Sequence, residues 1–361
     1  MNGRSWAWLL ASLLAGAGLS MWHAAVTVDH LSLKALTDFR AAEPFQYRIL
    51  VPAIARMVTT LLPVAPLAVY LTIEALCWTG ILIVARKALR EMAAGAAEQA
   101  PWISWTILWP LVAHLMKPQY FRPLDETGRA VAFETIWREP VTFSAAPNLY
   151  YPYDVPAALF VLWLFVTMHR LASTGRRRTL LTYLAVFAAA AVNRESAILV
   201  VPAFVLLMRT RLSPTSLWLT VIAQVGWVIL VQGSLRALVG GTVGVNPQAE
   251  LGAYEWHAKT NFATLLVPAC FVSAVPLFAG GLYLPLVRWR AKLTRWYGLA
   301  LGAYVVPVVV LGFCLGQVLE ARVFVEAVPV IWLAAVQVIA AGGDRPAASP
   351  RANLTPGTHW T

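Results

Sequence analysis

The sequence is short of charged residues. Asp, Glu, Lys and Arg make up 12% of the 361 residues, hydrophobic residues make up 59%, and the mean hydropathy is +0.66. Soluble domains carry about 25% charged residues, so half that value excludes an ordinary soluble globular domain. Long apolar runs separated by short polar segments predict instead an all-α, polytopic helical bundle in a membrane.

Cysteine is also scarce. Cys77, Cys270 and Cys314 each lie inside an apolar stretch, which excludes a disulfide framework and gives no zinc-ligand spacing. The histidines show no metal-ligand spacing either. No GxSxG, HExxH, P-loop or dinucleotide GxGxxG motif occurs in a suitable context. The residues themselves therefore predict no metal site.

Acidic residues are outnumbered, 17 against 28 Lys and Arg, which gives a formal net charge of +11. A basic balance can indicate a nucleic-acid partner. Here the basic residues are scattered between apolar runs, so they indicate membrane topology and no nucleic acid. The first run, behind Arg4, predicts a retained signal anchor because many further runs follow it.

The apolar runs predict the membrane spans. A separate short stretch, Tyr47–Leu62, carries Arg48 and Arg56 and predicts an interfacial amphipathic helix. Residues 117–149 predict a long loop. We expect one domain over residues 1–341 and a disordered cytoplasmic tail over 342–361, which is rich in Pro, Ala and polar residues. The runs are Ser5–Val28, Leu67–Ala85, Trp102–Met116, Tyr150–Met168, Leu180–Met208, Leu217–Val239, Phe262–Leu286, Tyr297–Leu315 and Val323–Ala341.

The run Leu180–Met208 decides the topology. It is too long for one span and is interrupted by Asn193-Arg194-Glu195-Ser196. If it crosses twice, one face of the membrane carries 16 of the 28 Lys and Arg residues but only three acidic residues. The other face then carries 12 Lys and Arg residues and 13 acidic residues. The positive-inside rule favours this arrangement. It predicts about ten spans in the inner (plasma) membrane, with both termini cytoplasmic.

The polar residues of the outer face are the candidate site. An acid of the first outer loop could act as general base toward a hydroxyl; we favour Asp38, with Asp29 and Glu43 as alternatives. Arginine suits an anionic group such as phosphate, so we expect Arg48 and Arg194 to bind the phosphate, with Arg194 held by Glu195 or Asp154. We expect Asp154, Glu195 and Glu320 to shape the sugar pocket. The candidate substrate-binding residues are Arg48, Tyr153, Asp154, Asn193, Arg194, Glu195, Glu320 and Arg322.

Each candidate has a structural alternative. Asp38 and Glu43 fit a solvated loop, Arg48 fits snorkelling at the interface, and Asp154 fits an acid that complements a helix dipole. Glu74 lies within a span and must be paired or protonated. It fits a structural hydrogen-bond partner as well as a proton relay, so it stays outside the predicted site.

Four blocks resemble small bacterial membrane proteins of the GT-C class of glycosyltransferases. The resemblance implies an inverting transfer of a sugar from a polyprenyl-phosphate carrier to an envelope glycan or lipid acceptor outside the cytoplasm. It places an essential acid in the first outer loop and leaves a divalent metal open, although no paired DxD or ExD is present. The blocks are Phe45-Gln46-Tyr47-Arg48-Ile49-Leu50-Val51-Pro52, Tyr151-Pro152-Tyr153-Asp154-Val155-Pro156, Asn193-Arg194-Glu195-Ser196 and Glu320-Ala321-Arg322-Val323-Phe324.

Two other functions compete with a glycosyltransferase. A transporter or lipid-carrier flippase would need polar residues spread through the membrane and internal pseudo-symmetry. Glu74 alone lies deep, and the two halves do not visibly repeat. A non-enzymatic scaffold has no positive feature in the sequence. The glycosyltransferase is therefore the first hypothesis and the transporter or flippase the second.

Overall fold

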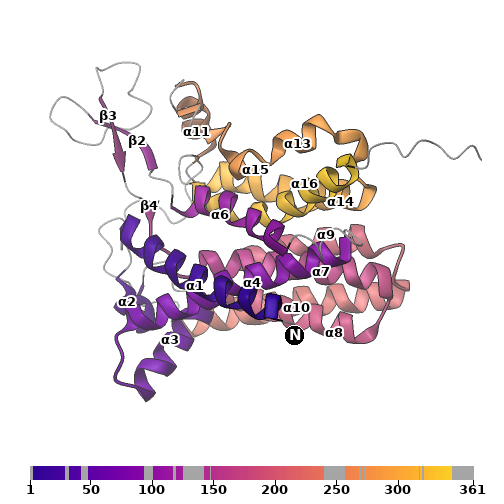
Figure 1. Cartoon of the computed structure of the whole chain (residues 1–361). Helices are drawn as coiled ribbons and strands as arrows, with labels where there is room; N and C mark the ends of the chain where they lie inside the picture. The colour runs from indigo at the N-terminus through magenta and orange to yellow at the C-terminus, as the bar shows by residue number, and fades with distance from the viewer. Residues whose placement is uncertain are drawn as a thin grey trace, which may run out of the picture.

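The computed structural model describes residues 3–28, 32–41, 48–92, 101–116, 119–124, 142–146, 148–239, 257–267, 270–271, 274–316, 318 and 321–343. In these residues the chain is a helical bundle with four short strands at one end (Figure 1). The longer elements are α1 (Gly3–Val26), α4 (Pro66–Met92), α7 (Asp154–Thr174), α8 (Arg177–Asn193), α10 (Pro214–Val239) and α16 (Val328–Gly343).

The remaining helices are short. They are α2 (Leu33–Thr37), α3 (Leu50–Leu61), η2 (Pro101–Ile107), α6 (Leu108–Leu115), η4 (Glu195–Leu199), α9 (Val200–Met208), α11 (Ala258–Leu265), η5 (Phe278–Gly281), α13 (Tyr283–Arg288), η6 (Arg290–Lys292), α14 (Arg295–Ala300), the π-helix η7 (Leu301–Val305), α15 (Val306–Leu315) and η8 (Ala321–Ala327).

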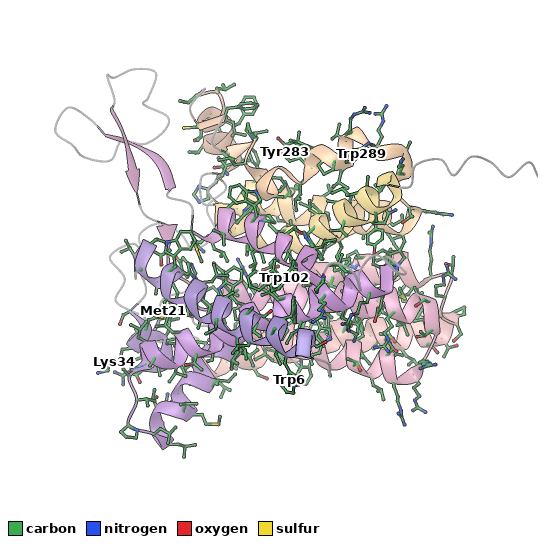
Figure 2. All side chains as sticks on the ribbon, in the orientation of Figure 1. Trp6, Met21, Lys34, Trp102, Tyr283 and Trp289 are labelled. Carbon is green, nitrogen blue, oxygen red and sulfur yellow. The ribbon has the colours of Figure 1, made fainter. Side chains whose placement is uncertain are left out.

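Six helical stretches are long and apolar enough to cross a membrane: Ser5–Val26, Pro66–Glu91, Asp154–Thr174, Pro214–Leu238, Arg295–Leu315 and Arg322–Ala341. Their outer surfaces suit lipid. Trp6 is 59% exposed and Met21 66% exposed, and Figure 2 shows both on the outside of the bundle. So many exposed apolar side chains require an apolar surrounding. The predicted all-α membrane bundle is confirmed at this level, as a multi-pass membrane protein.

The prediction that the Leu180–Met208 run forms two helices is confirmed. Helix α8 ends at Asn193, and Arg194 takes an extended backbone conformation (φ −160°, ψ 138°) before the chain re-enters a helix at Glu195. Helix α7 ends cleanly for a different reason: Gly175 has φ +61°, a left-handed conformation that suits glycine.

Two regions differ from the predicted spans and loops. The run Phe262–Leu286 is not one helix: α11 ends at Leu265, and the backbone is left-handed at Ala279, Gly280 and Gly281. The predicted loop 117–149 contains strands. The antiparallel pair is β2 (Gln119–Leu124) with β3 (Thr142–Ala146), and β4 (Asn148–Leu149) pairs in parallel with β1 (Thr27–Val28).

Side-chain contacts distinguish the two ends of the bundle. One end holds Arg170 and Lys292, and we call it the basic end. There Arg170 pairs with Glu91 at 3.9 Å, and the Lys292 Nζ donates to the Ala341 carbonyl at 3.1 Å. The other end carries α2, α3 and the strands at the left of Figure 1. We call it the network end, after the network of charged side chains that meet there. It holds Arg194, whose carboxylate partners come from α7 and η8.

Helices α1 and α4 pack closely because α1 presents Gly16 to α4. A Cβ at Gly16 would lie 2.6 Å from the Ala75 carbonyl oxygen, while a Cβ at Gly18 on the same helix would meet nothing within 4 Å. The Ser20 hydroxyl donates to the Leu71 carbonyl at 2.8 Å in the same interface. The absence of a Cβ at Gly16 therefore allows the two helices to approach closely.

Gly16→Ala should separate α1 from α4 and destabilise the bundle by about 1–3 kcal/mol, the usual cost of overpacking. Gly18→Ala is the matched control and should be neutral or slightly stabilising, because its Cβ enters open space and alanine favours the helix. Thermal unfolding of both variants in the same detergent measures the difference. Equal melting temperatures for the two would contradict the close packing at Gly16.

Candidate functional site

The network end is organised around Asp154. Its carboxyl is 1% exposed and lies in the first turn of α7, where the helix dipole favours a negative charge. The Arg194 Nη1 lies 3.2 Å from Asp154 Oδ1, and the Arg322 Nη1 lies 3.8 Å from Asp154 Oδ2. One carboxylate thus joins the start of α7 to the α8–η4 turn and to η8.

Arg194 has a second carboxylate partner in Glu326. The Arg194 Nη1 lies 3.0 Å from Glu326 Oε1, which also accepts a hydrogen bond from Ser196 Oγ at 2.7 Å. The Tyr304 hydroxyl donates to Glu326 Oε2 at 3.4 Å. Arg194 is therefore held between Asp154 and Glu326, and the prediction that Asp154 holds it is confirmed.

Arg48 forms a separate pair with Glu195. Its Nη2 and Nε donate to the two carboxylate oxygens at 2.8 and 3.3 Å, and its guanidinium lies 4.8 Å from the centre of the Tyr153 ring. Arg48 is 8% exposed, which contradicts the snorkelling alternative. Arg322 makes the corresponding contact with Tyr151, at 3.6 Å. Arginine over an aromatic face adds a cation–π attraction.

The charges of this network balance. Arg48, Arg194 and Arg322 face Asp154, Glu195 and Glu326, so the formal sum of the six is zero. Burial alone would lower the pKa of Arg48, yet Glu195 keeps it well above its ordinary value. This pair is therefore ionised at neutral pH.

The buried polar atoms Tyr153 Oη and Asn193 Oδ1 lack hydrogen-bond partners among the described residues. The amide of Asn193 donates from Nδ2 to the Tyr153 carbonyl at 3.1 Å, which fixes its orientation. A cavity of about 10 Å³ borders Asn193, Arg194, Ser196 and Glu326. It has room for about one water molecule. These atoms leave hydrogen-bonding capacity for a hydroxyl ligand.

The structure brings most of the predicted binding residues together. Three predicted residues, Asp29, Glu43 and Glu320, lie outside the described part of the chain. The residues that share the network are Arg48, Tyr153, Asp154, Asn193, Arg194, Glu195 and Arg322.

Asp38 is not part of this network. It ends α2, its side chain is exposed, and it forms no ion pair with any residue that the structure describes. Its helix nevertheless packs beside the site: Leu36 shares a buried apolar cluster with Tyr151 and Tyr153. The Thr37 Oγ1 lies 3.0 Å from the Tyr70 hydroxyl, which anchors α2 to α4.

Sequence reasoning missed Glu326. It lies within the predicted span Val323–Ala341, and an acid inside an apolar span is itself a signal of a partner or a function. Tyr151 was marked only as part of the block that begins with it. Its stacking under Arg322 depends on how η8 meets the segment before α7.

Glu74 belongs to a second buried cluster. Its Oε1 lies 2.8 Å from His23 Nδ1 and accepts from Trp78 Nε1 at 3.0 Å, and its Oε2 accepts from the Tyr150 hydroxyl at 2.8 Å. The Tyr150 backbone N–H also donates to the Val28 carbonyl at 3.0 Å. Because Tyr150 leads directly into the segment that ends at Asp154, this cluster positions the first turn of α7.

An apolar cavity of about 300 Å³ lies among α6, α11, α15 and η8. Its polar atoms include those of His114, whose Nε2 accepts from the Ala279 N–H at 2.9 Å. Phe324, two residues after Arg322 on η8, forms part of its wall. The lining is Ala113, His114, Leu265, Ala274, Val275, Leu277, Phe278, Tyr283, Val309, Phe313, Val318 and Phe324.

The metal left open by the family resemblance finds no ligand set in the described residues. They contain no group of three or more His, Cys, Asp or Glu side chains that could hold a metal ion. Two acids of the network, Asp154 and Glu326, share Arg194 as their cation. No step proposed below is routed through a metal.

Arg194→Ala should destabilise the protein by about 3–5 kcal/mol, because it leaves the buried Asp154 and Glu326 without their shared cation. Arg194→Lys keeps the charge without the planar fork and should lose less. Arg209→Ala, an exposed arginine at the end of α9, is the control and should change stability by less than about 0.5 kcal/mol. Denaturant unfolding in detergent measures all three. A loss of stability in Arg194→Ala no larger than that in Arg209→Ala would contradict a structural role for the contact of Arg194 with Asp154 and Glu326.

No protein-family model, curated protein or solved structure matches this chain. The contacts of its own side chains are therefore what any functional assignment has to explain.

Proposed function

We propose that the chain is an integral membrane glycosyltransferase of the GT-C class. It transfers a sugar from a polyprenyl-phosphate carrier to an envelope glycan or lipid acceptor on the outer face of the inner membrane. One observation carries the proposal: a buried network of three arginines at one end of an apolar helical bundle, with an apolar cavity against the same helix η8 that bears Arg322.

The leaving group of such a transfer is a polyprenyl phosphate, whose negative charge needs a cation nearby. Arg194 already binds two carboxylates at 3.2 and 3.0 Å and acts as a structural clasp. Arg322 lies 3.8 Å from Asp154, the longest of the network's ion pairs. A phosphate can replace this contact at the lowest cost, so we assign Arg322 to bind the donor phosphate. We assign Arg48 to bind other oxygens of the same phosphate.

The apolar cavity is assigned to the carrier chain. Its wall is mostly aliphatic and aromatic, and exposed apolar side chains such as Leu277 (43%) and Val275 (37%) surround it. An isoprenoid chain binds such a surface through the hydrophobic effect and needs few polar partners. Phe324 and Arg322 on one helical turn would then separate the apolar chain from its phosphate.

Asp38 is assigned as the general base that takes the proton from the acceptor hydroxyl. Glu195 already accepts two hydrogen bonds from Arg48, so its carboxylate is not free to take a proton from an acceptor. Asp154 and Glu326 are both bound to Arg194. Asp38 is exposed at the end of α2, and Leu36 of that helix packs in a buried cluster with Tyr151 and Tyr153. Asp29 and Glu43 remain the alternatives.

We also propose about ten crossings, with both termini cytoplasmic and the network end outside. Four shorter apolar stretches would add to the six long ones: residues 101–115, 177–193, 195–208 and 258–288. Irregular backbone at membrane depth is tolerated where protein surrounds it. The basic side chains at the opposite end agree with the positive-inside rule.

The proposed topology predicts which positions an impermeant thiol reagent reaches. After replacement of the three native cysteines, single cysteines at positions 140 and 250 should react in intact cells, and those at 175 and 290 should react only after permeabilisation. Gly175 ends α7 at the basic end, so labelling at 175 from outside would overturn the topology and the outward-facing site with it.

Asp38→Asn should lower sugar transfer by about 10²–10⁴-fold, because asparagine is nearly isosteric but cannot accept the proton. The assay uses the purified protein with a panel of polyprenyl-phosphate sugars and follows transfer and donor binding separately. Donor binding should change little. Lys34→Gln, exposed on the same helix, is the control.

Full activity of Asp38→Asn with loss in Asp29→Asn or Glu43→Gln would move the base to another acid of the loop. Movement of the labelled carrier across vesicles by a protein that transfers no sugar would instead favour the flippase.

A further inference from the structure

A second cavity lies at the basic end of the bundle, between the start of α1 and the end of α4. Its volume is about 370 Å³. It shares no residue with the charge network and does not depend on the proposed transferase function. Its lining is Ser5, Trp8, Leu9, Ile83, Arg86, Lys87 and Arg90.

The charges around this cavity are unbalanced. Arg86, Lys87 and Arg90 lie within five residues of α4, and Arg86 and Arg90 are four residues apart on one helix face, where like charges repel. None of the three forms an ion pair within the described ranges of the chain. The adjacent acid, Glu91, pairs with Arg170 instead. This clustering contrasts with the charge network, where Arg48, Arg194 and Arg322 each face a carboxylate.

Two hydrogen-bond donors of the cavity wall are buried and unsatisfied. The Arg86 guanidinium stacks 4.3 Å from the centre of the Trp8 ring, and Trp8 is only 4% exposed. The Arg86 Nε and the Trp8 Nε1 have no hydrogen-bond partner among the residues that the structure describes. A buried donor without a partner is energetically unfavourable. A ligand with several acceptor oxygens would satisfy both donors and the cationic excess.

The surroundings of the cavity are those of a membrane interface. It lies at the ends of two membrane-spanning stretches, Ser5–Val26 and Pro66–Glu91. Trp6 and Leu10 on α1 and Ile83 on α4 are exposed apolar side chains beside it, and Figure 2 shows Trp6 on the outside of the bundle. A tryptophan at such a depth is typical of the headgroup region. An acyl chain can follow these side chains while a headgroup enters the cavity.

We propose that this cavity is a binding site for an anionic phospholipid. The headgroup phosphate accepts from Arg86, Lys87 and Arg90, and the indole N–H of Trp8 donates to an oxygen of the same headgroup. Basic pockets between membrane helices are suited to anionic headgroups, and each cation near the surface contributes about 1 kcal/mol. A neutral phospholipid offers no net charge to balance the three cations and binds less tightly.

The test is native mass spectrometry of the purified full-length protein, titrated with phosphatidylglycerol or with phosphatidylcholine of the same acyl chains. Phosphatidylglycerol should bind at least about tenfold more tightly. Arg86→Gln should remove most of this preference, and Lys87→Gln should weaken binding about fivefold, the equivalent of 1 kcal/mol. Arg177→Gln, an exposed cation at the same end, removes the same charge and should leave binding within about twofold.

Folding and ligand source are controlled separately. Lys87 is exposed, so Lys87→Gln reports on binding even if Arg86→Gln fails to fold. Inorganic phosphate, added alone, should neither stabilise the protein nor displace phosphatidylglycerol.

Three results would each overturn the proposal. They are equal affinity for the two lipids, a loss in Lys87→Gln no larger than in Arg177→Gln, and displacement by inorganic phosphate at matched concentration, which would make the cavity a free-anion site.

Discussion

The contact of Arg194 with Asp154 and Glu326 is the interaction on which the network end depends. Asp154 starts α7, Glu326 lies on η8, and Arg194 occupies the extended link between α8 and η4. Three helical elements therefore meet at one guanidinium. Since an isolated charge in an apolar bundle costs several kcal/mol, each of these groups needs the others in place.

Glu74 and Arg86 are also charged groups within an apolar bundle, and their surroundings compensate their charges in different ways. Glu74 is satisfied within the protein, by His23, Trp78 and Tyr150. Arg86 has an aromatic face in Trp8 and retains a buried donor without a protein partner. The fully satisfied carboxylate of Glu74 indicates a structural role, and the unsatisfied donor of Arg86 indicates a missing ligand. The difference separates the positioning of α7 from the proposed binding of a lipid headgroup.

The balanced charges of the network also bear on the proposed transfer. A donor phosphate that approaches Arg322 competes with Asp154, which Arg194 continues to hold. Binding would then exchange one carboxylate contact for a phosphate contact without leaving Asp154 uncompensated. The stacked tyrosines, Tyr151 and Tyr153, hold the guanidinium planes of Arg322 and Arg48 in place during the exchange. Such an arrangement favours a ligand of matching charge over any neutral molecule.

The sequence by itself determined the class of protein and the position of its longest helices. The length of an apolar run is a local property, and it must match the thickness of the bilayer's hydrocarbon core. It also identified the turn at Arg194, where a polar tetrapeptide interrupts an apolar run. Only the tertiary structure decided the partners. Arg48 meets Glu195 across 147 residues, and Ser196 meets Glu326 across 130. Such pairs depend on how helices pack, which no local pattern records. The same holds for the left-handed turn at Ala279 that breaks the predicted span Phe262–Leu286, and for the strands within the predicted loop.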